Sequence, residues 1–279
     1  MDNELITRLF FFLSVFGMVA YWETRQPRRT LSCAKVSRWL NNLSLVVLNS
    51  VVLRLAFPTA AVGVAAFGEE QGWGLLNLTA LPYAVTVLIS VILLDLIIYL
   101  QHVLFHSLPL LWRLHMVHHT DLDYDVTTAL RFHPIEIVLS MVIKCTAIIA
   151  LGAPALAVII FEIVLNACAM FNHGNLHLPN KIDKILRLFI ITPDMHRVHH
   201  SSIKQETNSN YGFSLSIWDY LFGTYKAQPK HGHETMEIGL RHYRDKRIEH
   251  LHHMLTLPFV ARVGEYPINK EDKEKIRKP

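Results

Sequence analysis

Five long apolar stretches alternate with polar segments along this chain. They cover residues 6–21, 43–67, 78–100, 135–151 and 155–171. A helix rises about 1.5 Å per residue and needs ~20 apolar residues to cross the hydrocarbon of a bilayer, so each stretch is a candidate transmembrane helix. Arg54 and Pro58 interrupt the second stretch. The last two are short and are joined by Gly152-Ala153-Pro154, so they form either two crossings or one re-entrant hairpin.

The first stretch has the position of a signal peptide but not its charge pattern. Asp2 and Glu4 stand where a signal peptide carries basic residues, and no small-residue cleavage site follows, so we expect a retained helix. Composition agrees with a membrane location: 51% of residues are hydrophobic, mean hydropathy is +0.27, and charged residues make up 18%, below the ~25% of soluble domains. The sequence predicts an all-α integral membrane protein, with residues 1–279 forming a single membrane domain.

Basic residues predict the orientation. The segment after the first stretch carries Arg25, Arg28, Arg29, Lys35 and Arg38, whereas Glu69 and Glu70 follow the second stretch. Short loops rich in lysine and arginine face the cytoplasm. Counting crossings from this first loop places the segments after residues 100 and 171 in the cytoplasm too. A nucleic-acid partner is not expected, because these basic residues adjoin spans where anionic lipid is nearer.

Histidines cluster after the third and the fifth apolar stretches. The same pattern occurs twice, as His102-x3-His106 with His115-x2-His118-His119, and as His173-x3-His177 with His196-x2-His199-His200. Helical positions three, four and seven apart share a face, so the imidazoles of each motif can point at one region. Thr192 as N-cap, followed by Pro193 and Asp194, predicts that the last triplet lies in a helix.

Ten imidazoles exceed the six ligands of an octahedral ion, so the pattern predicts two metal ions. The motifs hold no carboxylate, which argues against calcium and magnesium, whereas imidazole suits zinc, copper, iron and nickel. We expect residues 102–133 and 173–225 to form a cytoplasmic cap that holds the metals, and residues 264–279 to form a solvated tail. The spacing or setting of six further histidines does not fit a ligand role: His231, His233, His242, His250, His252 and His253.

Two carboxylates lie within apolar stretches, where a charge costs about 2.5–3.5 kcal/mol at the bilayer centre. Asp95 shares a helical face with His102 and His106, and Glu162 shares one with His173 and His177 if the fifth helix continues that far. Each is therefore a candidate hydrogen-bond partner of a ligand imidazole. The alternative is a structural role, for example as a partner of Arg54.

Polar residues between the two halves are further candidates. Asp125, Arg131 and His133 could support or gate the metal site, or could instead cap helices and pack at the membrane surface. Pro134 and Glu136 fit the first turn of the fourth helix. The aromatic segment 210–225 is expected to lie against lipid headgroups or to roof the site, with ordinary packing of the cap as the alternative.

The four motifs beside apolar spans resemble the fatty acid hydroxylase and sterol desaturase superfamily over residues 95–225. The phrases LWRLHMVHH, DVTTALRFHP, MHRVHHS and NYGFSLSIWDYLFGTY resemble its bacterial branch. The resemblance implies a non-haem di-iron oxygenase in the bacterial inner membrane rather than in the endoplasmic reticulum. In such enzymes reduced iron binds O2, and the activated oxygen abstracts hydrogen from an unactivated C–H bond of a lipid. The resemblance also implies that zinc can replace iron in a purified sample. It assigns the role of metal ligand to His102, His106, His115, His118, His119, His173, His177, His196, His199 and His200.

The resemblance also implies a partner that supplies electrons. The sequence shows no dinucleotide-binding glycine motif and no fused cytochrome domain, so a separate ferredoxin or cytochrome-like donor is expected, attracted by the basic cytoplasmic face. The lipid substrate, which comes from the bilayer, stays open among sterol-like, carotenoid, alkylglycerol and aminolipid molecules.

Several activities remain open at this stage. Hydroxylation is the favoured outcome, but desaturation follows the same hydrogen abstraction and the residues do not separate the two. A metal hydrolase would need a general base beside its ligands, as in His-Glu-x-x-His, and the sequence has none. A metal transporter or sensor is the alternative from another class, although transporters place their ligands near the bilayer midplane.

Overall fold

The computed structural model describes residues 2–269, and within them the chain is helical, with three isolated β-bridges and no strand. The six longer helices of the membrane region are α1 (Asp2–Arg25), α2 (Lys35–Ala56), α3 (Ala60–Glu70), α4 (Tyr83–Ser107), α6 (Pro134–Leu151) and α7 (Ala155–Asn172). The remaining helices are α5 (Pro109–His119), α8 (Asn180–Leu186), α9 (Pro193–His199), α10 (Lys204–Thr207), α11 (Ile217–Leu221), α12 (Gly232–Thr235) and α13 (Leu251–Val260). Three 3-10 turns complete the described chain: η1 (Leu75–Leu78), η2 (Thr128–Leu130) and η3 (Lys246–Glu249).

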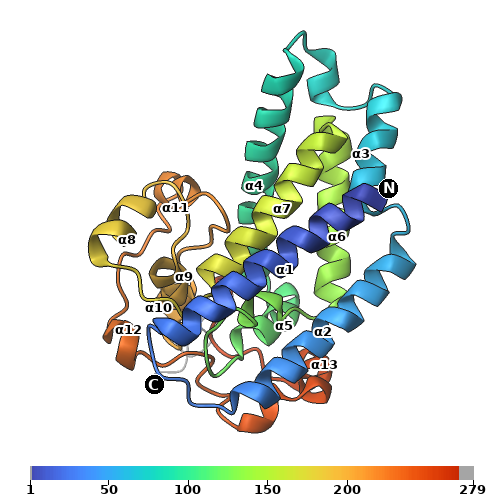
Figure 1. The fold of residues 1–279 in the computed structure, drawn as a ribbon. Helices are drawn as coiled ribbons and strands as arrows, with labels where there is room; N and C mark the ends of the chain where they lie inside the picture. Colours follow the sequence, from blue (N-terminus) through green and yellow to red (C-terminus); the bar gives the residue numbers. More distant parts are fainter. Residues whose placement is uncertain (1, 270–279) are drawn as a thin grey trace, which may run out of the picture.

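Helices α1–α4, α6 and α7 form one end of the molecule and the remaining helices form the other (Figure 1). Helices α3, α4, α6 and α7 pack against one another, while α1 lies along α7 and α2 along α6. Helix α5 and helices α8–α13 gather at the opposite end with their loops. We call this end, residues 108–133 and 173–269, the cap. It differs from the predicted 102–133 and 173–225, because α4 continues through His102 and His106 to Ser107 and the segment after residue 225 packs with the same end. The ends of α4 and α7 meet the cap, which positions the residues that follow them.

Five helical segments are long and apolar enough to cross a membrane: Ile6–Arg25, Lys35–Leu78, Tyr83–Ser107, Pro134–Leu151 and Ala155–Asn172. Their outer faces are apolar too, as Leu55 and Leu88 show with exposed fractions of 78% and 60%. Exposed leucines on long helices are what a lipid environment requires. The structure therefore confirms the predicted all-α membrane fold, and α6 and α7 match their predicted stretches to within one residue at each end.

The second predicted stretch, residues 43–67, is not one helix. It divides between α2 and α3, which are separated by Phe57, Pro58 and Thr59. Proline lacks an N–H and disfavours helical backbone at the residue before it, and Phe57 accordingly has φ −133° and ψ 75°. The Arg54 side chain donates to the carbonyl of Pro58 at 3.1 Å, so this arginine caps the break and, among residues 2–269, forms no ion pair with a carboxylate.

The cap has its own apolar core beneath α5. Trp112, Met116 and Val117 are fully buried there, packed with Leu45 of α2 and Met254 of α13. Burying a methionine or valine side chain contributes about 1.5–3 kcal/mol. This core fixes α5, whose opposite face carries His115, His118 and His119.

The prediction that residues 264–279 form a solvated tail is wrong for the first of these residues. Tyr266 is buried and stacks on Trp112, and the N–H of Ile268 donates to the carbonyl of His106 at 3.0 Å. This segment is ordered because the tyrosine ring fills the core beside α5. The rest of the tail, residues 270–279, lies outside the described residues.

Candidate metal centre

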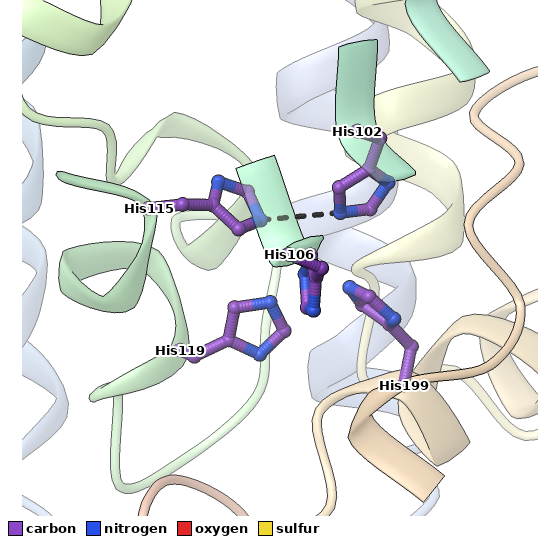
Figure 2. A group of neighbouring side chains, drawn as sticks. All are labelled: His102, His106, His115, His119 and His199. Atoms are coloured by element: carbon purple, nitrogen blue, oxygen red, sulfur yellow. Dashed lines mark hydrogen bonds between the residues drawn. The ribbon is translucent and has the colours of Figure 1, made fainter. Parts of the chain in front are cut away.

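Nine of the ten predicted ligand histidines are buried in two adjoining groups. Within each group, one nitrogen of every ring lies within 4.8 Å of those of the other rings. The first group, drawn in Figure 2, is His102, His106, His115, His119 and His199. The second is His118, His173, His196 and His200. Two nitrogens bound to one zinc ion at about 2.0–2.1 Å are at most ~4.2 Å apart, so each group is close to the size that one ion requires.

Each group takes rings from both halves of the chain. Helix α4 supplies His102 and His106 at positions i and i+4, and α5 supplies His115 and His119 in the same way. Helix α9 then adds His199 to the first group, while His196 and His200 join the second. The N-cap predicted at Thr192 is confirmed: its hydroxyl accepts from the N–H of Met195, so α9 begins where the spacing of its histidines requires.

Hydrogen bonds fix which ring nitrogen faces inward. Carbonyl oxygens of Tyr211, Ala169 and Ser209 lie 2.7 Å from Nδ1 of His102, His173 and His199, respectively. A carbonyl oxygen only accepts, so each of these Nδ1 atoms carries the proton and each Nε2 keeps its lone pair. The protein thus presents Nε2 of these three rings as ligand atoms, in the way that hydrogen bonds to metal-bound histidines do.

Several inward-facing ring nitrogens lie so close together that a cation or a proton is needed between them. Nε2 of His102 lies 3.1 Å from Nε2 of His115, and Nε2 of His173 lies 3.1 Å from Nε2 of both His118 and His196. Lone pairs facing at that distance repel unless a cation or a proton lies between them. Further buried ring nitrogens have no hydrogen-bond partner in the described chain, among them Nε2 of His106 and His199 and both nitrogens of His119 and His200. The donor set therefore fits metal ions.

Burial keeps these imidazoles neutral. Desolvation lowers the pKa of His115 and of His173 to about 3, and lowers the pKa of His118, His199 and His200 well below the usual value. Neutral imidazole is the form that binds transition metals. Aromatic rings close the site around them: Phe132 stacks on His118 with ring centroids 4.5 Å apart, and Trp112 lies against His106 and His119.

His177, predicted as the tenth ligand, lies outside both groups, and its side chain is exposed. The prediction assumed that the fifth helix continues through both His173 and His177. Helix α7 instead ends at Asn172, and the following segment is extended and pairs with the α1–α2 loop, where the N–H of His177 donates to the carbonyl of Gln26. Without helical backbone, a spacing of four residues does not place two rings on one face. Glu162 and the two histidines therefore do not share a face either.

Asp95 and Glu162, which were predicted to accept hydrogen bonds from ligand imidazoles, bind other residues instead. The carboxylate of Asp95 accepts from Trp218 Nε1 at 2.9 Å and from the N–H of Leu215, so it holds the aromatic segment against α4. Glu162 forms ion pairs with Arg8 and Lys144. No hydrogen bond or ion pair links either carboxylate to a clustered histidine in the described chain.

Asp125, Arg131 and His133, the candidates between the two histidine-rich segments, form contacts that hold helices and loops together. Asp125 pairs with Arg38 and accepts from Trp39, and His133 caps the start of α6. Arg131 comes nearest to the site, because its guanidinium donates to the carbonyl of Val117, one residue before His118. It also binds Glu249, which ties the end of α5 to η3.

Two residues that do contact the imidazoles were not predicted as partners. Glu136 Oε1 lies 2.6 Å from Nδ1 of His115, and Asn208 Oδ1 lies 3.1 Å from Nδ1 of His106. Glu136 was expected only to favour the start of the fourth helix. A carboxylate three residues after His133 was visible in the sequence, but its approach to His115 depends on how α6 packs on α5.

Replacing Glu136 by alanine is expected to weaken metal binding about 10–100-fold, the usual effect of losing a carboxylate that orients a ligand imidazole. Glu136→Gln retains an acceptor for Nδ1–H and should lose less. The measurement is the metal retained by purified protein during dialysis against a graded chelator. Glu265→Ala, which removes a carboxylate that is 54% exposed, is the matched control. Wild-type retention by Glu136→Ala would show that His115 does not depend on this contact.

A cavity of about 390 Å³ leads from the first histidine group into the membrane region. His102, His115 and Glu136 line one end, and Arg8, Lys144 and Glu162 line another part of its wall. Apolar side chains make up much of the remaining wall: Phe12, Val46, Leu53, Ile98, Phe105, Leu130, Phe132, Ile137, Met141, Leu165 and Phe213. A cavity of this size and lining fits part of a lipid.

Comparisons with known proteins agree with this geometry. An ornithine lipid hydroxylase from Rhizobium tropici is 26% identical over 99% of this chain and 82% of its own length. Alkylglycerol monooxygenases from Homo sapiens and Xenopus tropicalis are each 28% identical, over 52% and 86% of this chain. The matches span only 30% and 50% of those two proteins. No solved structure matches the chain at a significant level.

The family model described as fatty acid hydroxylase matches residues 87–224. These residues carry all nine clustered histidines, together with Glu136 and Asn208. Residues 87–224 of this chain are therefore a fatty acid hydroxylase domain.

Proposed function

We propose that this protein is a membrane-bound, non-haem di-iron hydroxylase that uses O2 to oxidise a C–H bond of a lipid. The family and the relatives support an oxidoreductase that acts on lipids. The observation that carries the finer proposal is the pair of buried histidine groups with inward-facing lone pairs, the first of which borders a largely apolar cavity through His102 and His115. Two ions, one for each group, would satisfy these nitrogens.

In this proposal His102, His106, His115, His119 and His199 hold one ion, and His118, His173, His196 and His200 hold the other. Bound iron would supply the redox chemistry that activates O2 toward an unreactive C–H bond, which no side chain can do alone. The contacts of Glu136, Asn208 and the three backbone carbonyls hold the rings in one orientation. Phe132 and Trp112 exclude water from the site, which favours reaction with the lipid over side reactions.

The cavity would deliver the lipid to the first group. His102 and His115 belong both to that group and to the cavity wall, so a chain lying in the cavity reaches the imidazoles without leaving an apolar environment. Since the opposite part of the wall lies among α1, α6 and α7, entry from the bilayer is the natural route. The named activities of the relatives support a lipid with a polar headgroup as the substrate.

We also propose that the cap and its metal centre face the cytoplasm. The basic α1–α2 loop lies on the cap, where Arg28 pairs with Asp194 of α9 and Arg29 donates to the carbonyl of Met236. The loop that the positive-inside rule assigns to the cytoplasm is therefore on the same side as the histidines. With the bacterial relative, this supports the inner membrane as the location.

A separate electron donor, a ferredoxin or a cytochrome-like protein, would complete the reaction. A polar groove in the cap supports this: it is lined by Lys226, Lys230 and Arg241, and also by Ser201, which directly follows His200. Glu206 and Glu237 also line the groove, so its three cationic side chains outnumber its carboxylates. An acidic donor bound there would lie next to the residue that follows His200. Electrostatic attraction would accelerate such an encounter.

The test is a comparison of lipids from cells with and without the gene, grown under 18O2. The proposal predicts a lipid that appears only with the gene and carries one 18O atom. A product with a new double bond and no label would identify a desaturase with the same site. If neither product appears while purified protein in vesicles transports metal ions, the chain is a transporter and the proposal fails.

A further inference from the structure

A second polar cluster lies in the cavity wall, away from the histidines. Lys144 Nζ lies 2.5 Å from Glu162 Oε1, and Arg8 Nη2 lies 2.7 Å from Glu162 Oε2. Glu162 is almost fully buried, with 4% of its side chain exposed, whereas the figures for Lys144 and Arg8 are 13% and 30%. All three residues line the same cavity as His102 and His115. We call them the charged cluster.

The charged cluster lies well inside the membrane region. Lys144 follows Glu136 by eight residues on α6, which corresponds to about 12 Å along the helix axis. Glu162 is near the middle of α7. Apolar side chains such as Met141 and Leu165 line the cavity beside the cluster. A molecule that spans the cavity would therefore meet imidazoles at the histidine end and charged side chains about 12 Å away.

Lys144 has hydrogen-bonding capacity to spare. Its ammonium has three N–H donors, and within the described chain Glu162 accepts one of them. Charged groups inside a membrane region are expensive, and they usually mark a functional site. An ion pair that served only to stabilise the bundle would not need to line a cavity that reaches the metal centre.

We propose that the charged cluster is a second subsite of the cavity, in which Lys144 binds the anionic group, carboxylate or phosphate, of an amphiphilic lipid. The proposal deepens the proposed function, on which it rests for the identity of this lipid as the substrate. Glu162 holds Lys144 in place when the cavity is empty and competes with the anionic group for its ammonium. The distance between the subsite and His102 then determines which carbon of the lipid lies at the metal centre.

The test is ligand binding to the purified, metal-loaded protein in phosphatidylcholine nanodiscs. The probes share a long alkyl chain and differ in the headgroup: palmitate, hexadecyl phosphate and neutral hexadecanol, each competing with a fluorescent fatty acid. We expect Lys144→Met to weaken binding of the preferred anionic probe about tenfold or more, as loss of a charge-assisted hydrogen bond does. Hexadecanol binding should be unchanged. Whichever anion depends more on Lys144 identifies the group as carboxylate or phosphate.

Substitution of Glu162, the ion-pair partner of Lys144, should have the opposite effect on binding of the anionic probe. Glu162→Gln removes the competing carboxylate, so the anionic probe should bind more tightly than to wild type. A purely structural ion pair predicts instead that both variants lose affinity for charged and neutral probes alike, and that result would overturn the proposal. Equal affinity of Lys144→Met and wild type for both anions would overturn it too.

Two controls separate this result from misfolding and from the proposed function. Lys144→Arg keeps the positive charge and should keep the preference for the anionic probe, while retained hexadecanol binding shows that the cavity of each variant is formed. Because binding is measured without turnover, absence of an oxidised lipid would disprove the proposed function and leave the subsite intact. Conversely, an 18O-labelled lipid made by the wild type, together with equal anion binding by Lys144→Met and wild type, would overturn the subsite and leave the proposed function intact.

Discussion

Replacing His118 or His199 by alanine is expected to abolish oxidation of the lipid, whereas replacing His177 should leave it unchanged. His199 belongs to the first histidine group and His118 to the second, so each substitution removes a nitrogen from a different proposed ion site. His177 is exposed and lies in neither group. We expect a loss of at least about 100-fold in the first two variants, beyond the 10–100-fold typical of residues that only orient a ligand. The amount of 18O-labelled lipid per unit of protein measures it.

His177→Ala is the matched control, because it removes the same side chain from the same repeated motif. If His177→Ala lost activity as severely as His118→Ala, the assignment of nine ligands would be wrong. If His118→Ala retained activity, the second ion would not be needed for the reaction. Comparing both variants with wild type therefore tests the composition of each group separately.

Replacing Arg38 by leucine is expected to lower the free energy of unfolding by about 3–5 kcal/mol, the usual result of breaking a buried ion pair. Its guanidinium lies 2.8 Å from Asp121 and 2.6 Å from Asp125, with all three side chains almost completely buried. Burial raises the pKa of Asp125, but Arg38 outweighs that effect and holds the pKa below its usual value. Without Arg38, two carboxylates beside the end of α5 would be left uncompensated.

The measurement is thermal and denaturant unfolding of the purified protein in detergent. Arg247→Leu is the control, because Arg247 pairs with Asp245 at 2.6 Å on the surface, with side-chain exposures of 74% and 57%. Such exposed pairs contribute about 0–1 kcal/mol. Equal stability of the two variants would mean that the network of Arg38, Asp121 and Asp125 does not hold α2 to the cap.

The membrane helices and most of the metal centre could be predicted from the sequence, because both depend on local periodicity. Apolar runs of sufficient length define α4, α6 and α7, and helical spacing brings His102 together with His106 and His115 together with His119. The N-cap at Thr192 is equally local. These features need no knowledge of how distant segments pack.

The predictions that failed concern residues whose position depends on tertiary packing and not on the local sequence pattern. The spacing of His173 and His177 equals that of His102 and His106, but α7 ends at Asn172, so the second ring turns away. Asp95 shares a face with His102, yet its carboxylate binds Trp218, which is 123 residues away in the chain. Glu136 reaches His115 only because α6 packs against α5. Contacts of this kind depend on tertiary structure, which a periodicity argument does not contain.

The most direct test of the central claim is the metal content of the purified wild-type protein, measured by elemental analysis with X-ray absorption at the metal edge. The account predicts two iron ions per chain, or two zinc ions that iron can replace, each surrounded by nitrogen ligands. It also predicts that His118→Ala and His199→Ala each bind fewer than two. A wild-type chain that binds no metal after expression and reconstitution with iron would contradict the account.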